Sequence, residues 1–296
     1  METLTLGDID ITPVVDVPPS PVPRSFVFPD VPLDAWQAQE ELLVPAHWIP
    51  DPDVIRLVMR TWLVRSEGRT ILVDTGVGNG KDRPNLPFHA NLRTDFLANL
   101  SGTGVQPEDV DLVVLTHLHG DHVGWNTSFD GAAWVPTFPN ARYVAPRADF
   151  DFFNPANGIA SRCAPLMVNV FEDSVAPIRE AGQLTLWEEE YVVDGGLRIR
   201  PAPGHTPGSS VITLTSGTDR AAFVGDLLHS PLQLSEPDCC PMLDEDEPRA
   251  TATRRRLLGW AADSNALLLP AHLTGSGAMT IERDGAGFAV KDWAGF

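Results

Sequence analysis

The chain has 296 residues, 43% of them hydrophobic, which is enough to bury the core of one large α/β domain or of two small ones. Its 40 acidic residues outnumber its 21 basic ones, and the formal charge of −19 disfavours nucleic acid and anionic membranes as partners. The sequence contains no stretch of roughly 18 apolar residues, the length that a membrane span requires.

Residues 1–8 contain neither the basic region nor the apolar run of a secretory signal. The 3 cysteines are too few for a disulfide framework, and two of them, Cys239 and Cys240, are adjacent. We interpret this pair as two ordinary thiols, with a vicinal disulfide as the alternative. Together these features predict a cytoplasmic protein.

The N-terminal part is predicted to begin with a strand or hairpin arm over residues 3–16, which the prolines of residues 18–23 interrupt. Residues 24–52 show no regular period and are rich in aromatic residues and proline. We interpret residues 17–52 as an inserted segment. It would act as an arm or lid over a site, as a dimer contact, or as a packed surface loop, and the sequence leaves these alternatives open.

Two strands, 54–64 and 70–73, are predicted to form a hairpin around the turn 66–69. The second strand ends in Asp74, where a carboxylate can accept the free ring N–H of a metal-bound histidine. A helix is expected at about residues 92–100.

Histidine and aspartate side chains gather directly after the apolar run 110–115, which reads as a buried strand. In an extended segment, side chains two positions apart lie on one face at roughly 7 Å, so His117 and His119 can bind one ion. Asp121 and His122, on the turn beyond, can face a second ion. This density of ligand types predicts a metal site rather than a polar loop.

An aromatic belt follows the histidines. Trp125 comes three residues after His122 and is therefore expected near the metals. Trp125, Phe150 and Phe153 are candidates to line an apolar substrate pocket, although aromatic side chains more often belong to a core.

Three later strands also end in a possible ligand. Strand 196–202 leads to His205 in a turn rich in proline and glycine, strand 221–224 leads to Asp226, and strand 267–269 leads to His272. A helix is expected over residues 244–263, and a C-terminal hairpin over 279–293 around residues 284–285. Scattered core histidines would not collect at strand ends in this way.

The order of these motifs, HxHxDH, GHTPG, GD and a strand-end histidine, resembles the metallo-β-lactamase superfamily of hydrolases from about Asp74 to His272. The resemblance implies an αββα sandwich in which two mixed sheets lie face to face with helices outside. It also implies a single domain over residues 1–296 and a dinuclear metal site at one edge of the sheets.

Carried over residue by residue, the resemblance implies two sets of metal ligands that share one carboxylate. The ligands are His117, His119 and His205 for the first metal and Asp121, His122 and His272 for the second, with Asp226 bridging the two. Asp74 matches the acid that, in this family, accepts a hydrogen bond from the free ring N–H of a metal-bound histidine. Thr116, which immediately precedes His117, is expected to form a hydrogen bond that supports the ligands.

Residues 225–229 and the arginine-rich helix after them look most like the branch that contains methyl parathion hydrolase and acyl-homoserine lactonases. Asp226 stands where the best-known antibiotic-degrading members have a cysteine or lack an acidic ligand, which disfavours a β-lactamase. His119 stands where the flavodiiron oxidoreductases carry a glutamate. The catalytic tyrosine of some lactonases has no counterpart, because Tyr143 and Tyr191 both precede Asp226.

The expected protein is therefore a dinuclear metal-dependent hydrolase with two divalent ions. Zinc is the default, and nitrogen and oxygen ligands are also compatible with manganese, iron or cobalt. A hydroxide shared by the two metals would attack a small neutral, partly apolar ester, lactone or organophosphate, since zinc lowers the pKa of bound water to about 7. Asp121 is expected to carry a proton to the leaving group. His229 either contacts the substrate or is a strand-end histidine bonded to the backbone.

Two alternative functions remain open at this stage. A thioesterase of the glyoxalase II type would need a cluster of lysine and arginine residues, which the sequence does not point to. A regulatory module would keep the fold and the metals without turnover. A homodimer is possible under either reading.

Overall fold

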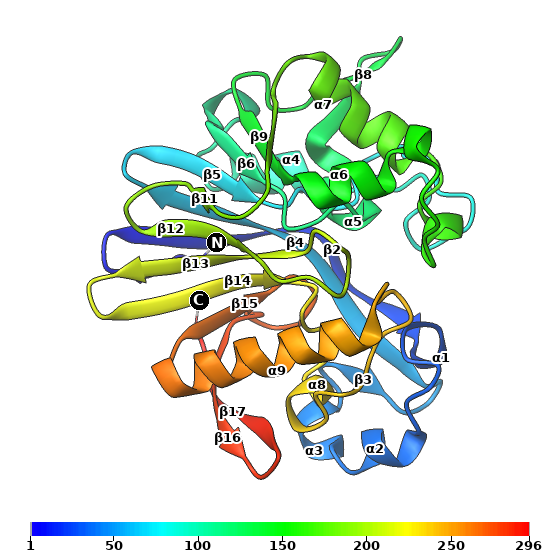
Figure 1. The fold of residues 1–296 in the computed structure, drawn as a ribbon, viewed down its shortest axis with the longest axis vertical. Helices are drawn as coiled ribbons and strands as arrows, with labels where there is room; N and C mark the ends of the chain where they lie inside the picture. The colour runs from blue at the N-terminus through cyan, green and yellow to red at the C-terminus, as the bar shows by residue number, and fades with distance from the viewer. Residues whose placement is uncertain (1, 296) are drawn as a thin grey trace.

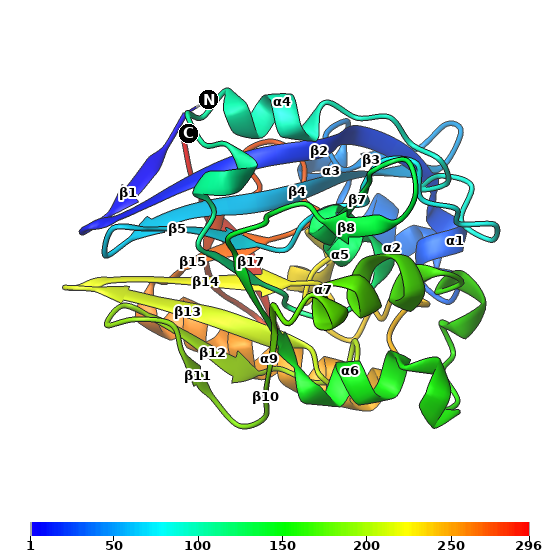
Figure 2. The same ribbon diagram turned by 90° about the horizontal axis from the view of Figure 1, so that it is seen from above.

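Two mixed β-sheets lie face to face in the computed structural model, with helices on the outer face of each (Figures 1 and 2). The structure describes residues 2–295. The first sheet has eight strands and the second has seven. The αββα sandwich that the sequence predicts is confirmed.

The first sheet contains β1 (Leu4–Leu6), β2 (Ile9–Pro23), β3 (Trp48–Ile49), β4 (Val54–Ser66), β5 (Arg69–Val73), β6 (Leu112–Val114), β9 (Arg142–Pro146) and β10 (Leu184–Trp187). The second contains β11 (Tyr191–Val192), β12 (Leu197–Pro201), β13 (Ser210–Ser216), β14 (Asp219–Gly225), β15 (Leu267–Pro270), β16 (Met279–Asp284) and β17 (Gly287–Trp293). A separate hairpin pairs β7 (Thr127–Phe129) with β8 (Trp134–Pro136).

The α-helices are α1 (Arg24–Val27), α2 (Leu33–Gln37), α3 (Glu40–Leu43), α4 (Phe96–Ser101), α5 (Gly120–Val123), α6 (Arg147–Phe153), α7 (Ala176–Glu180), α8 (Leu232–Ser235) and α9 (Glu247–Ser264). Within residues 2–295, none of them combines the length and the apolar character that crossing a bilayer requires.

Alternation of side chains along the strands gives each sheet one apolar face toward the other sheet. In this central core, Trp62 of β4 packs against Phe223 of β14 with ring centroids 6.2 Å apart. The outer faces are covered separately. Phe96 of α4 is buried on the first sheet and Leu258 of α9 on the second, so these two helices lie on opposite outsides of the sandwich (Figure 2).

The prediction that prolines end the first strand is wrong, because β2 runs through them to Pro23. β1 pairs with β2 only as far as Ile11, so beyond that point β2 is an edge strand that hydrogen-bonds to β4 on one side. Proline lacks the backbone N–H and is tolerated at such an edge. Register shifts between Val15 and Ser20 accommodate it.

The irregular structure that the sequence suggests for residues 24–52 is not observed. Residues 17–52 are here called the N-terminal cap. They contain the end of β2, the helices α1 to α3 and the short strand β3. Trp36 and Trp48 are fully buried with ring centroids 5.9 Å apart, and Phe28 packs edge-on against Trp36. The cap is therefore an ordered part of the molecule, and its apolar side chains form one buried cluster with residues of β4.

The predicted hairpins are confirmed: β4 pairs with β5 and β16 with β17, both antiparallel. Two helices begin later than expected. α4 begins at Phe96 because the backbone N–H of Thr94 donates to Asn79 Oδ1 at 2.7 Å, in a loop. α9 begins at Glu247 because the side chain of Asp246 accepts the N–H of Arg249.

Candidate metal centre

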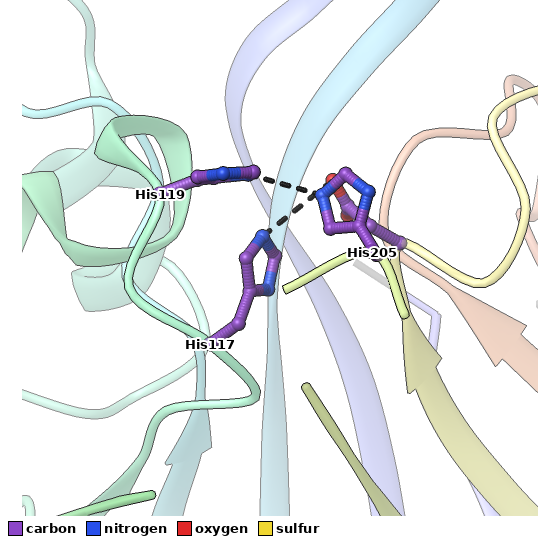
Figure 3. A group of neighbouring side chains, drawn as sticks. His117, His119 and His205 are labelled. Carbon is purple, nitrogen blue, oxygen red and sulfur yellow. Dashed lines mark hydrogen bonds and ion pairs between the residues drawn. The ribbon is translucent and has the colours of Figure 1, made fainter. Parts of the chain in front are cut away.

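Segments that follow four strands of both sheets converge on one cluster of histidine and aspartate side chains. The first group, His117, His119, His205 and Asp226, has ligand atoms within 4.8 Å of one another. The second group, Asp121, His122 and His272, meets the same limit. Figure 3 shows the rings of His117 and His119 facing His205 across the gap between their segments.

The distances within the first group are those of ligands around a common point. His205 Nε2 lies 3.0 Å from His119 Nδ1 and 3.1 Å from Asp226 Oδ2. His117 Nε2 lies 3.7 Å from the same carboxylate oxygen. All of these side chains are buried.

The second group is assembled in the same way. His122 Nε2 lies 3.3 Å from His272 Nε2, and Asp226 Oδ1 lies 3.0 Å from the first and 2.9 Å from the second. Asp121 Oδ2 lies 3.6 Å from His272 Nε2. Asp226 thus directs one oxygen to each group.

These residues fit a pair of divalent ions. Two nitrogen ligands on one tetrahedral zinc, each about 2.1 Å from it, lie roughly 3.4 Å apart, close to the nitrogen separations observed here. Within residues 2–295, the buried nitrogen His117 Nε2 has no hydrogen-bond partner, as expected of an atom reserved for a metal. The donors are all nitrogen and oxygen, the set that suits zinc and its neighbours.

Asp74 and Thr116 contact the Nδ1 atoms of His122 and His117, the ring nitrogens that face away from the cluster. The ring N–H of His122 donates to Asp74 Oδ2 at 2.8 Å. The backbone N–H and the hydroxyl of Thr116 donate to the two oxygens of Asp74 at 2.7 and 2.8 Å, and the hydroxyl lies 3.0 Å from His117 Nδ1. Such contacts fix the tautomer and the orientation of a ligand ring.

A second carboxylate with this role, Asp244, was not identified from the sequence. His205 Nδ1 donates to Asp244 Oδ1 at 2.8 Å, and Arg254 of α9 donates to the other oxygen at 3.2 Å. The sequence places Asp244 only at the start of a predicted helix, so it carried no signal of this contact. For His272 the acceptor is the backbone oxygen of Val58 at 3.0 Å.

Asp149, also missed, joins the two segments that carry the first group. It is fully buried on α6 and accepts the N–H of Leu118 at 3.1 Å, the hydroxyl of Thr206 at 2.8 Å and the N–H of Gly208 at 2.6 Å. Burial raises the pKa of Asp149 to about 6, against the lowering effect of these donors. A side chain at position 208 has no room, because its Cβ would lie 2.7 Å from the backbone nitrogen of Asp149.

Burial and neighbouring charges shift the pKa values of the histidines of the cluster in different directions. Burial, reinforced by His122, holds the pKa of His117 well below its usual value. Burial acts in the same direction on His122, but Asp226 and Asp74 outweigh it and raise the pKa of His122. In the same way, Asp226 overcomes burial and raises the pKa of His205 to about 9. The carboxylates therefore make the centre attractive to cations.

An apolar cavity of about 60 Å³ adjoins the second group. His119, Asp121, His229 and His272 line it on the metal side, and most of the remaining lining is apolar, from the N-terminal cap, β4, residues 86–88 and residues 166–167. The side chain of Asp121 is 18% exposed, whereas that of Asp226 is 3% exposed. Asp121 is thus the carboxylate that a molecule in the cavity can reach.

Two of the predicted pocket residues lie elsewhere. Trp125 belongs to the core on the outer face of the first sheet, where it stacks on Phe96 at 5.4 Å and donates to Asp16 at 2.9 Å. Phe150 packs in the same core against Phe171 at 5.3 Å. Neither is among the residues that line the cavity, so their assignment to it is corrected.

Phe153 and His229 do lie beside the centre. The ring of Phe153 packs edge-on against His119 at 5.5 Å and lines a neighbouring groove of about 340 Å³. His229 is buried in the wall of the cavity with Nε2 at 3.2 Å from Asp226 Oδ2, and its ring stacks on His272. Within residues 2–295 its ring makes no hydrogen bond to the backbone, contrary to the alternative considered for it.

The cysteines take no part in this centre as ligands. Cys163, Cys239 and Cys240 are all free. Cys163 reaches the cavity wall, where its thiol donates to the backbone oxygen of Leu243 at 3.3 Å, and burial raises its pKa to about 12.

Two curated N-acyl homoserine lactonases are similar to this chain in sequence. An N-acyl homoserine lactonase from Bacillus sp is 24% identical over 167 residues, which cover 53% of this chain and 58% of that protein. One from Bacillus cereus is 21% identical over 183 residues, covering 58% and 63%. The chain thus spans less than two thirds of the length of these curated relatives.

Solved structures share the fold over nearly the whole chain. The dizinc quorum-quenching lactonase AidC has a TM-score of 0.80 at 22% identity, covering 100% of this chain and 98% of that one. The hydrolase AbOPH of the beta lactamase superfamily has a TM-score of 0.82 at 23% identity, covering 97% and 95%. At such identities the likeness establishes the fold alone.

The family follows from the sequence match. The model of the Metallo-beta-lactamase superfamily matches residues 60–273, which is more than half of the chain and includes every residue of both ligand groups. The fold and the order of the ligand-bearing strands agree with that match. The chain belongs to the metallo-beta-lactamase superfamily.

Proposed function

We propose that this chain is a dinuclear metal-dependent hydrolase of small neutral, partly apolar esters and lactones, with organophosphates as a further substrate class. The observation that carries the proposal is the position of Asp226, which lies between two ligand groups beside an apolar cavity. The N-acyl homoserine lactonases among its relatives support the choice of reaction.

The proposed ligands are His117, His119 and His205 on one side and Asp121, His122 and His272 on the other, with Asp226 shared. Two divalent ions bound there, zinc by default, would supply Lewis acidity and lower the pKa of bound water. Asp74 and Asp244 orient ligand rings, and this fixes the geometry before a substrate arrives.

Asp121 and His229 are the proposed contacts to the reacting atoms. Asp121 is the more exposed of the ligand carboxylates, so it can carry a proton to the departing oxygen. His229 lies in the wall of the cavity with Nε2 3.2 Å from Asp226 Oδ2, and its Nδ1 has no hydrogen-bond partner within residues 2–295. A substrate oxygen in the cavity would supply that partner. Phe153, packed on His119, supports the apolar surface nearby.

The lining of the cavity favours a neutral substrate over a charged one. Among the described residues that line it there is no lysine or arginine. A glutathione or carrier thioester would need such cations to bind its acidic groups. The glyoxalase II alternative therefore receives no support from the cavity.

A panel assay on the metal-loaded protein tests the proposal. Lactones, aryl esters and phosphotriesters should be hydrolysed, and thioesters of acidic carriers should not. Metal analysis of the same sample should give two ions per chain. Two ions without hydrolysis of any class would favour the regulatory module, whereas rapid thioester hydrolysis would favour the glyoxalase II type.

A further inference from the structure

The wall of the apolar cavity contains His89, a histidine that belongs to neither ligand group. His89 lies in the loop between β5 and α4, away from the strand ends that carry the metal ligands. It lines the cavity together with Asp121 and His272. The side chains of this loop that share the wall with it, Leu86 and Phe88, are apolar.

The ring of His89 is free to bind a ligand. Within residues 2–295 it makes no hydrogen bond, whereas the other polar group of this wall outside the metal-bearing segments, the thiol of Cys163, is bonded to Leu243. Burial lowers the pKa of His89, against the opposing effect of Asp121. A neutral imidazole offers one N–H donor and one acceptor nitrogen.

The loop that carries His89 is held in place from two directions. The backbone N–H of Asn91 donates to Lys81 O at 2.7 Å and closes the loop. Arg83 donates to both oxygens of Asp173 at 2.6 and 2.9 Å, and both side chains are buried. A hydrogen-bonding group on a fixed loop costs little entropy when it binds a ligand.

We propose that His89 hydrogen-bonds a second polar group of the substrate, and so selects esters and lactones that carry an amide or another carbonyl beside the scissile bond. This inference rests on the proposed hydrolase function. A substrate that fills the apolar cavity without such a group would cover His89 and leave its ring unpaired, which costs binding energy. An unpaired polar group among apolar side chains therefore discriminates against an analogue that lacks its partner.

A matched pair of lactones tests the role of His89. One is N-hexanoyl-homoserine lactone, and the other is α-heptyl-γ-butyrolactone, in which methylene groups replace the amide. The wild type should prefer the amide lactone. In His89→Phe, kcat/KM for the amide lactone should fall by about tenfold, the value of one neutral hydrogen bond, while that for the alkyl lactone is unchanged or higher.

Two control variants separate hydrogen bonding from packing. His89→Gln keeps an N–H donor and should retain part of the preference. Phe88→Leu changes a neighbouring side chain of the same wall and should alter kcat/KM for both lactones by the same factor. The proposal is overturned if His89→Phe lowers kcat/KM equally for both lactones or leaves the preference for the amide lactone intact.

Binding of the ring-opened products distinguishes this proposal from the proposed function. If the wild type hydrolyses neither lactone, the hydrolase assignment fails for this class. Calorimetry on the zinc-loaded protein then compares N-hexanoyl-homoserine with the hydroxy acid of the alkyl lactone. Tighter binding of the amide by about tenfold in the wild type, lost in His89→Phe, supports the role of His89. Equal affinities in the wild type overturn it.

Discussion

Asp226 Oδ2 lies 3.1 Å from His205 Nε2, while the other oxygen of Asp226 lies 2.9 Å from the ring nitrogen of His272 in the second group. One carboxylate thereby lies between His205, which follows β12, and His272, which follows β15, and these two strands are not neighbours in the second sheet. The two candidate metal positions are therefore coupled through Asp226, and changes to it differ from changes to any histidine.

Replacing Asp226 with Ala should remove both metals together, because it is proposed to touch each. Metal analysis after dialysis should show the loss of both ions. kcat/KM should fall by about a thousandfold or more, since Lewis-acid stabilisation is worth several kcal/mol. His117→Ala is the matched control and should empty the first position before the second. Loss of one ion alone from the Asp226 variant would refute the bridging role.

The strands and the ligand motif were predictable because their signals are local. Apolar runs predicted the ends of β5, β6, β14 and β15, and the histidines and aspartates follow those ends directly. The contacts that orient the ligands were not predictable. Asp244 is 39 residues from His205 in the sequence, and no local pattern joins them.

Trp125 illustrates how a short distance in sequence misleads. It follows His122 by three residues, yet the chain turns away from the centre between them. The N–H of Gly124 donates to Gly76 O at 2.8 Å and that of Trp125 to Thr75 O at 2.9 Å. Only a glycine fits at position 124, where a Cβ would lie 1.9 Å from Val77. These contacts direct Trp125 into the core.

Other predictions need information that one chain does not hold. A cytoplasmic location, a homodimer and the assignment of residues 1–296 to a single domain stay predictions. The choice between a lid, a dimer contact and a packed surface segment for residues 17–52 also stays open, and Val22, Phe26 and Val27 of this cap line the cavity. Phe26 also packs edge-on against Phe88 at 5.9 Å, so the cap meets the loop of His89 there.

Asp244→Asn should weaken the first metal position selectively. The amide cannot accept the ring N–H of His205 and pair with Arg254 as the carboxylate does. We expect a loss of about 10- to 100-fold in metal affinity, measured by competition with a chelator. Asp238→Asn changes an exposed carboxylate paired with Arg255 and should leave the affinity unchanged. Equal affinities in the two variants would contradict the role given to Asp244.

Gly208→Ala should destabilise the fold near the first ligand group. The added Cβ would lie 2.7 Å from the backbone nitrogen of Asp149, and neither backbone can yield easily. We expect a loss of about 1–3 kcal/mol in the free energy of unfolding, measured by chemical denaturation. Gly195→Ala is the control, because its Cβ would meet only the side-chain tip of Glu67. A loss of the same size in both variants would argue against a special constraint at position 208.

Lys81 should make stability depend on pH. Its side chain is buried between Thr127, Asp173 and Trp134, and burial lowers its pKa to about 7 from an ordinary value of 10.5. The unfolded chain therefore binds more protons on Lys81 between about pH 7 and 10.5, so this residue contributes a rise in stability with pH across that window.

Comparison of the wild type with Lys81→Met isolates that contribution. Both proteins are unfolded with denaturant from pH 6.5 to 9. As the pH rises, the free energy of unfolding of the wild type should increase relative to that of Lys81→Met. The reason is that below about pH 7 the folded wild type contains a buried ammonium group, which destabilises it. Lys291→Met changes an exposed lysine bonded to Asn265 and should follow the wild type at every pH. A constant difference between the wild type and Lys81→Met across this range would mean that Lys81 stays protonated in the folded protein.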